Sequence, residues 1–286
     1  MAGRRILPAT GAFVNNRTEI SIDKNRKDLR NMQITAEERR DEIVAAIREA
    51  EKIKVSDLAK KYGISEVTVR KDLELLEAEG HLTRVHGGAV GTNKLYVNMD
   101  TGERYKTNSQ SKRALAERVA TLIEDNDTIM MNAGTTLTYV LQAIRDKKNI
   151  SIVTNSVQNA TEAALYPTFT VILLGGELDP KYQFTHGYNA EEQIRNYHAA
   201  KCILSVDGVS AESGLTLYYS NEASLARCMM ESSAETIVVA DASKLGKNVF
   251  ARITDAARAG TVVTNKTDRQ EEISKLKKLG VRVIEA

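Results

Sequence analysis

The 286-residue chain has few of the residues that mark metal centres and disulfide frameworks. Its 2 cysteines, Cys202 and Cys228, lie in apolar or helical contexts without CxxC spacing, and its 4 histidines form no cluster. We therefore expect free thiols in a reducing compartment, with no metal and no cofactor. No apolar run approaches the roughly 18 residues of a membrane span, and no signal peptide is visible. These absences predict a cytoplasmic protein with no membrane partner.

An excess of charge of one sign is also missing. Lys and Arg total 40 against 38 Asp and Glu, which leaves a net charge of +2. A general basic surface therefore does not point to nucleic acid, and any DNA binding must depend on local placement. The length and the 42% hydrophobic content allow one large domain and a smaller one.

Residues 1–33 are polar and weakly patterned. Seven basic residues outnumber three acidic ones in this tail, a net charge of +4. The tail is either a basic arm that touches the DNA backbone or a disordered extension, and we favour the extension.

Residues 34–91 predict three short helices followed by a β-ribbon. Thr35 and Glu38 have capping-box spacing before the first helix. Gly63 ends the second helix, and "EVTVRKDLELLEAEG" forms the third. The alternating stretch "HLTRVHGGAV" then predicts a ribbon with a Gly-Gly turn. This order is typical of a winged helix-turn-helix. Residues 92–107 lack a clear period and are predicted to be a linker.

The third helix has a buried stripe of Val69, Leu73 and Leu76, so its N-terminal polar residues are free to face DNA. The alternative is a small helical bundle with a solvated charged face, because residues 35–90 hold ten basic and twelve acidic residues. The turn and the wing favour DNA. The candidate contacts on the helix and the wing are Ser65, Val67, Thr68, Arg70, Lys71, Arg84, His86 and Gly87.

Residues 108–286 have a different rhythm. Apolar, β-branched runs such as "ISIVTN", "FTVILLGG" and "TIVVAD" alternate with helical segments. This alternation predicts an α/β domain with a parallel sheet covered by helices on both faces. Since ligands of such folds bind where the strand ends converge, polar residues that follow the strands are candidate ligand contacts.

The stretch "VSDLAKKYGISEVTVRKDLELLEAEGHLTRVHGGAV" resembles the N-terminal signature of the DeoR family of bacterial transcriptional regulators. The motifs "NAGTT", "VTNS", "LLGGEL", "VDGV", "NEA" and "DASKLG" follow in the order of that family's C-terminal domain. The resemblance implies a sensor domain like the sugar-phosphate isomerases of the ribose-5-phosphate isomerase type, which binds phosphorylated sugars or related metabolites.

The segment "NAGTT" also predicts an anion site from its own chemistry. Gly134 lets backbone N–H groups converge, Thr135 and Thr136 add hydroxyl donors, and the dipole of the following helix favours an anion. The alternative is that such residues only form turns. The candidate effector contacts at this and the other strand ends are Asn132, Gly134, Thr135, Thr136, Thr154, Asn155, Gly175, Gly176, Asp207, Gly208, Glu222 and Lys244.

The sequence departs from the family pattern at four places. Lys71 stands where a second arginine is common, which makes Arg70 the better candidate for base recognition. Asn132 replaces an Asp, and its amide can donate a hydrogen bond. Tyr218-Tyr219 replaces Thr-Pro, and these rings either stack on a ligand or pack internally. Ala226 stands where a lysine is common.

We expect a transcriptional repressor of carbohydrate-metabolism genes, not an enzyme. Its partners would be double-stranded operator DNA, a phosphorylated sugar and further copies of itself in a homodimer or tetramer. The alternative is a sugar-phosphate isomerase with an appended DNA-binding module, since Asp207, Glu222 and Lys244 supply the residue types of such chemistry. The DNA module favours the regulator.

Overall fold

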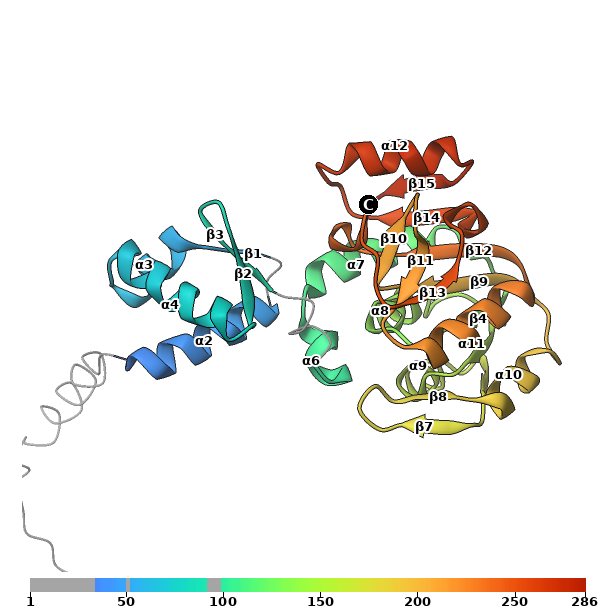
Figure 1. Cartoon of the computed structure of the whole chain (residues 1–286). Coiled ribbons are helices and arrows are strands. Elements are labelled where there is room, and N and C mark those ends of the chain that lie inside the picture. The colour runs from blue at the N-terminus through green and yellow to red at the C-terminus, as the bar shows by residue number, and fades with distance from the viewer. Residues whose placement is uncertain (1–33, 50–51, 92–98) are drawn as a thin grey trace, which may run out of the picture.

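The computed structural model describes residues 34–49, 52–91 and 99–286. Figure 1 shows a small head of helices and a β-ribbon, and a larger domain built around a sheet. The predicted tail at 1–33 and the first part of the predicted linker lie outside the described residues. In the part of the chain that is described, no helix is long and apolar enough to cross a membrane.

The head is a winged helix-turn-helix, as predicted. Its elements are α2 (Ala36–Glu49), β1 (Lys52–Lys54), α3 (Val55–Tyr62), α4 (Glu66–Ala78), β2 (Leu82–Val85) and β3 (Gly88–Gly91). The capping box is present, because Thr35 N–H donates to Glu38 Oε2 at 2.9 Å and Glu38 N–H donates to Thr35 Oγ1 at 3.2 Å. Strand β1 joins the ribbon to give the strand order β1-β3-β2, an addition that the sequence did not indicate.

The head is held together by an apolar cluster and one buried ion pair. Val69, Leu73 and Leu76 of α4 are all buried, as the helical period predicts. Beside them, Arg39 of α2 donates through Nε to Asp72 Oδ2 at 2.7 Å and through Nη2 to Oδ1 at 3.1 Å. Both side chains are buried, so the pair fixes how α2 crosses α4.

Part of the predicted linker is helical. Helix α6 (Thr101–Lys106) begins at Asp100, which accepts from Glu103 N–H while Glu103 accepts from Asp100 N–H. The sequence, which predicts a linker over 92–107, did not indicate this helix. A six-residue helix is too short to show an apolar period, and only its capping box was visible in the sequence.

The large domain is a parallel α/β fold. Its seven-stranded sheet has the order β15-β14-β12-β9-β4-β5-β6, and every pairing in it is parallel. The strands are β4 (Thr128–Met131), β5 (Ser151–Thr154), β6 (Thr170–Leu173), β9 (Ala199–Ser205), β12 (Ser233–Val239), β14 (Thr261–Thr264) and β15 (Arg282–Glu285).

Helices cover both faces of this sheet. One apolar cluster contains residues of α7 (Ser109–Ala120), α8 (Thr135–Ala143) and α9 (Val157–Ala163). The other contains residues of α10 (Tyr188–Ile194), α11 (Ser220–Glu231) and α12 (Gln270–Lys278). Within β9, Cys202 and Leu204 belong to one cluster and Ile203 to the other, as the alternation of side chains in a strand requires.

The chain winds in opposite directions from β4. It runs through β5 to the edge strand β6, then returns to place β9 on the other side of β4 and continues to β12, β14 and β15. The connections that leave β4 and β9 therefore lead to opposite halves of the sheet. This is the place where parallel α/β sheets hold ligands.

Two antiparallel additions flank the recess between these loops. A hairpin joins β7 (Glu177–Asp179) to β8 (Phe184–His186), and a small sheet contains β10 (Gly208–Ser210), β11 (Gly214–Leu217) and β13 (Ala251–Thr254). Two short 3₁₀ helices, Ala242–Lys244 and Ala256–Ala259, complete the domain. Cys202 and Cys228 are free, and Cys202 is buried.

The Arg39–Asp72 pair yields a stability prediction. Asp72→Ala leaves the Arg39 guanidinium buried without its partner, so we expect the head to lose roughly 3–5 kcal/mol. Hydrogen exchange of α4 amides in the full-length protein measures this loss. The matched control is Glu42→Ala, which breaks the exposed Glu42–Lys61 pair and should leave the protection of α4 close to that of the natural protein. Equal protection in the two variants would contradict the assigned role of Asp72.

Candidate functional site

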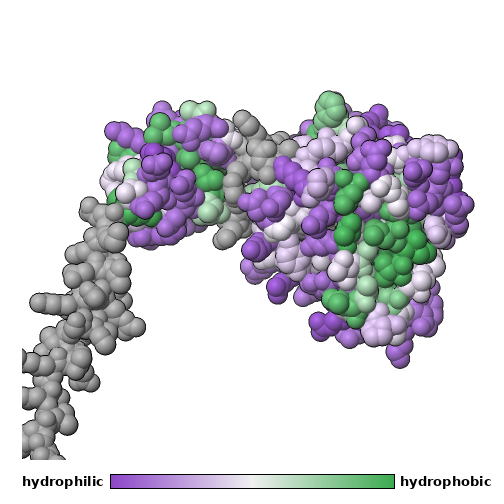
Figure 2. Space-filling model, turned by 90° about the horizontal axis from the view of Figure 1, so that it is seen from below, coloured by the Kyte–Doolittle hydropathy of each residue, from purple (hydrophilic) through white to green (hydrophobic). Residues whose placement is uncertain are grey.

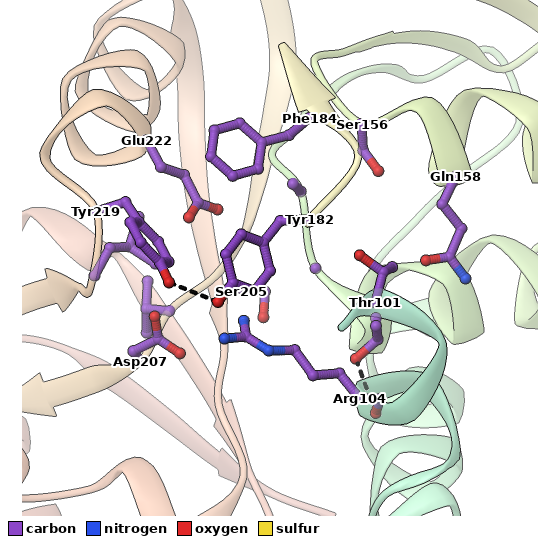
Figure 3. Close-up of a pocket in the computed structure, with 15 residues that line it drawn as sticks. Thr101, Arg104, Ser156, Gln158, Tyr182, Phe184, Ser205, Asp207, Tyr219 and Glu222 are labelled. Carbon is purple, nitrogen blue, oxygen red and sulfur yellow. Dashed lines mark hydrogen bonds between the residues drawn. The ribbon is translucent and has the colours of Figure 1, made fainter. Parts of the chain in front are cut away.

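A polar recess lies where the sheet changes its winding direction, and Figure 3 shows the residues around it. Its cavity volume is about 50 Å³. The walls come from α6, the loops after β4, β5 and β9, the β7–β8 hairpin, and the region from β11 to the start of α11. The lining residues are Thr101, Arg104, Ala133, Gly134, Thr135, Ser156, Gln158, Tyr182, Phe184, Ser205, Val206, Asp207, Leu217, Tyr219 and Glu222.

The N-terminus of α8 forms one end of the recess. Gly134 is its N-cap, and no side chain caps the helix there. A Cβ at Gly134 would lie 2.5 Å from Ser205 Cβ, so only glycine permits the close approach of the β4 and β9 loops. Gly134 and Thr135 line the recess, and the helix dipole makes this end attractive to an anion.

Three cations approach the same end. Arg104 lines the recess itself, while Lys112 and Lys244 line an adjoining smaller one together with Thr136. Lys112 Nζ donates to Thr135 Oγ1 at 3.1 Å and to the carbonyl oxygen of Arg104. Burial lowers the pKa of Lys112 to about 7, with Asp241 acting in the opposite direction. The charge of Lys112 therefore depends on pH near neutrality.

Two carboxyl groups, Asp207 and Glu222, also line the recess. Asp207 and Glu222 are each only 8% exposed. Asp207 Oδ2 accepts from Tyr218 N–H at 3.2 Å, and Asp207 Oδ1 lies 3.5 Å from Lys244 Nζ. Burial and the neighbouring Asp207 raise the pKa of Glu222 to about 8. A protonated Glu222 can donate a hydrogen bond, and the side-chain oxygens of Asp207 accept one from Tyr218 N–H.

Asn132 does not line the recess. Its Nδ2 donates to the carbonyl oxygen of Ser205 and its Oδ1 accepts from Ser205 N–H, both at 2.9 Å. The amide therefore bridges β4 to β9 beyond their last paired residues. Its Nδ2 also lies 3.5 Å from Glu222 Oε1, where an Asp would place a second carboxyl group.

Other predicted contacts lie elsewhere. Thr154 and Asn155 are fully buried beneath the loop after β5, and Asn155 Nδ2 donates to the carbonyl oxygen of Thr185. Gly175 and Gly176 lie in a separate surface groove against α10, because β6 is the sheet edge and β5 stands between it and β4. Gly208 packs inside the small sheet, where a Cβ would lie 2.4 Å from Thr216 Oγ1. The prediction that these strand ends share one rim site with Gly134 is wrong.

Several residues of the recess were missed from the sequence. Thr101 and Arg104 come from α6, which was expected to be linker, and Tyr182 comes from an unpredicted hairpin. Lys112 lies on a predicted helix, but nothing in the sequence distinguished it from a surface lysine. Tyr219 lines the recess, its ring packs 4.9 Å from that of Tyr182, and its hydroxyl donates to the Tyr182 hydroxyl at 2.6 Å.

The candidate DNA-binding residues form a second surface, on α4 and the wing. Ser65 is the N-cap of α4 and accepts from Thr68 N–H at 3.2 Å, so both residues also stabilise the helix start. Val67 is 61% exposed, and Arg70, Lys71 and His86 are exposed as well. Gly87 has a φ of 73° at the tip of the wing. Arg70, Arg84, His86 and Gly87 line a groove between α4 and the wing.

These two surfaces define a regulator that joins a helix-turn-helix head to a ligand-binding domain. Residues 39–94 match the DeoR-like helix-turn-helix domain, and residues 107–266 match the DeoR C terminal sensor domain. The chain belongs to the DeoR family of transcriptional regulators, as its motifs predict.

Named relatives agree with a regulator. The chain is 33% identical to the HTH-type transcriptional regulator YulB of Bacillus subtilis, over 80% of this chain and 88% of that protein. It is 32% identical to the transcriptional repressor AccR of Agrobacterium fabrum, over 82% and 92%. It is 30% identical to the lactose phosphotransferase system repressor of Streptococcus mutans, over 85% and 96%. These names support the expectation of a regulator and not the isomerase alternative.

Among solved structures, ribose 5 phosphate isomerase A from Neisseria gonorrhoeae aligns with a TM-score of 0.36 and 18% identity. The alignment covers 52% of this chain and 56% of that one.

The Asn132 bridge gives a prediction. Asn132→Asp removes the donor to the Ser205 carbonyl and places a carboxylate beside Glu222, so we expect a loss of roughly 1–3 kcal/mol in stability. Thermal unfolding at pH 7 measures it. Asn196→Asp, at an exposed position, is the matched control and should stay within about 0.5 kcal/mol of the natural protein. An unchanged melting temperature with altered ligand preference would instead make Asn132 a ligand contact.

Proposed function

We propose that this chain is a cytoplasmic repressor of carbohydrate-metabolism genes that binds operator DNA through residues 34–91 and is controlled by a phosphorylated sugar. The observation that carries the proposal is that one recess brings together a helix N-terminus, nearby cations and two buried carboxyl groups. A phosphate suits the helix N-terminus and the cations, and sugar hydroxyls suit the carboxyl groups.

The sugar phosphate would sit with its phosphate at Gly134 and Thr135. Arg104 supplies a charged donor there, and Lys112 adds a charge through the adjoining recess. The hydroxyl groups would meet Asp207 and Glu222. Asp207 and Glu222 are buried, so water reaches them poorly. Hydrogen bonds from the sugar hydroxyls would therefore satisfy these carboxyl groups.

Helix α6 connects this recess to the head. Arg104 and Thr101 line the recess, and the carbonyl oxygen of Arg104 accepts from Lys112 and from Thr135 Oγ1. Asp100 caps α6, and the preceding residue, Met99, is 3% exposed and belongs to the apolar cluster of the head. A ligand that changes the position of Arg104 would therefore also move the segment that packs into the head through Met99. We propose this as the route by which the sugar changes DNA binding.

The protein would act as a homodimer or tetramer, because one winged helix gives limited specificity and paired half-sites multiply it. Hydrophobic side chains gather on one side of the large domain in Figure 2. Exposed apolar residues of that domain include Leu173 on the edge strand β6 and Leu178 on β7. An apolar surface with an open sheet edge suits pairing with a second copy.

A thermal-shift screen tests the ligand class. Phosphorylated sugars should raise the melting temperature of the full-length protein, while the matching free sugars and inorganic phosphate should raise it much less. A ligand found in this way should change operator affinity. Stabilisation by the free sugars to the same extent would contradict the assignment of the α8 N-terminus to phosphate.

Arg104 provides the sharpest variant. Arg104→Gln keeps most of the side-chain length but loses the charge, so we expect the Kd of the sugar phosphate to rise by roughly 10–100-fold. Calorimetry measures the change. Arg118→Gln, an exposed arginine on α7, removes the same charge away from the recess and should change the Kd by less than about twofold. If the two variants change the Kd equally, Arg104 attracts the ligand only through long-range electrostatics and does not contact it.

Ligand binding should weaken as the pH rises from 7 to 9. Lys112, with its pKa lowered to about 7, and Glu222, with its pKa raised to about 8, each hold a proton below these values. A bound anion favours both protonated forms, so binding takes up protons in this window. The phosphate itself stays a dianion there, because its second pKa is about 6.

We expect the Kd to rise by up to about tenfold per pH unit for each proton taken up. Calorimetry at pH 7, 8 and 9 measures this slope. Lys112→Met should bind more weakly and show a flatter slope. A Kd that is constant from pH 7 to 9 would mean that neither group senses the anion.

A further inference from the structure

Both arginines predicted to contact DNA are bound by glutamates of α4. Arg70 Nη2 donates to Glu66 Oε2 at 2.6 Å, across one helical turn. Arg84 on β2 donates through its backbone N–H and its Nε to the two oxygens of Glu77, at 2.7 Å each. The positive charges of Arg70 and Arg84 are therefore each balanced by a neighbouring glutamate.

The two pairs have different geometry. The Glu77 carboxylate binds a backbone group and a side chain of the wing, so it fixes the wing against the end of α4. The Glu66–Arg70 contact is a single bond in the first turn of α4, with side chains 49% and 57% exposed. Val67 between them is 61% exposed, so this turn projects from the head. A recognition helix presents this turn to the base edges.

A carboxylate in the first turn of a recognition helix can form hydrogen bonds only with donor groups of the DNA. It has acceptor atoms alone, and the DNA backbone is negatively charged and offers no donor to it. In the major groove, the donors are the amino groups of cytosine and adenine, and Glu pairs well with the amino group of cytosine. Arginine, in turn, binds the O6 and N7 of guanine with two parallel bonds.

We propose that Glu66 is a specificity-determining residue of the DNA-binding surface: it orients Arg70 toward a guanine and itself accepts a hydrogen bond from a cytosine amino group. This inference depends on the proposed DNA-binding function. On DNA that presents only acceptors at this position, Glu66 has no partner there, and Arg70 must leave Glu66 to reach a phosphate. Glu66 therefore weakens binding to non-matching DNA more than binding to the matching site.

In vitro selection from a random duplex library with the full-length protein identifies the preferred site. The Kd for that site and for a scrambled duplex, at one salt concentration, then gives the specificity ratio. Glu66→Gln should bind the scrambled duplex several-fold more tightly and lower the specificity ratio by at least about tenfold. Its own selection should lose the preference for cytosine at one position and keep guanine at its neighbour.

Glu74→Gln is the matched control, because it removes the same charge from an exposed position of α4, while Arg70 and Arg84 form their ion pairs with Glu66 and Glu77. Its specificity ratio should stay within about twofold of the natural protein. If Glu66→Gln and Glu74→Gln tighten binding to both duplexes equally, Glu66 acts only as a general negative charge and the inference is overturned. An unaltered melting temperature shows that Glu66→Gln is folded.

Arg70→Lys supplies a second, independent result. It keeps the charge but lacks the planar pair of donors, so guanine preference should fall at the position next to the cytosine read by Glu66. Retained guanine preference would also overturn the inference. A natural protein that shows no sequence preference at all would instead contradict the proposed regulatory function, so the two failures are distinguishable.

Discussion

The change of winding direction between β4 and β9 is the constraint on which the sensor half depends. These two neighbouring parallel strands lead to opposite halves of the sheet, and a polar recess lies beyond their ends. The Asn132 amide joins the strands where their own pairing stops, and Gly134 allows the two loops to meet.

The recess contains ionisable groups whose charged forms are destabilised by burial. Desolvation raises the pKa of Glu222 and lowers the pKa of Lys112, so the neutral form of each group is favoured. Burial has this effect because it removes the water that stabilises a charge. An anionic, hydroxyl-rich ligand supplies such partners. Under the proposed function, binding of such a ligand would stabilise these groups, and α6, which lines the recess, would transmit the change to the head.

The sequence predicts the framework well because its signals are local. The stripe of Val69, Leu73 and Leu76 and the β-branched runs depend on periodicity alone, and both are buried as expected. The site is predicted in part: Gly134, Thr135, Asp207 and Glu222 do converge. Gly175 was predicted to lie beside Gly134, but β6 is the edge strand of the sheet. No local sequence pattern indicates the strand order. Arg104 and Tyr182 were missed because a short helix and a hairpin tip have no period.

The central claim is that the recess and the head are energetically coupled. The direct measurement is the Kd of the sugar phosphate for the full-length protein, alone and with saturating operator DNA. Coupling through α6 predicts two different values, separated by roughly 5–150-fold, and the same factor in the operator Kd when the sugar is saturating. Identical Kd values with and without DNA would contradict the account, because the sensor and the head would then act independently.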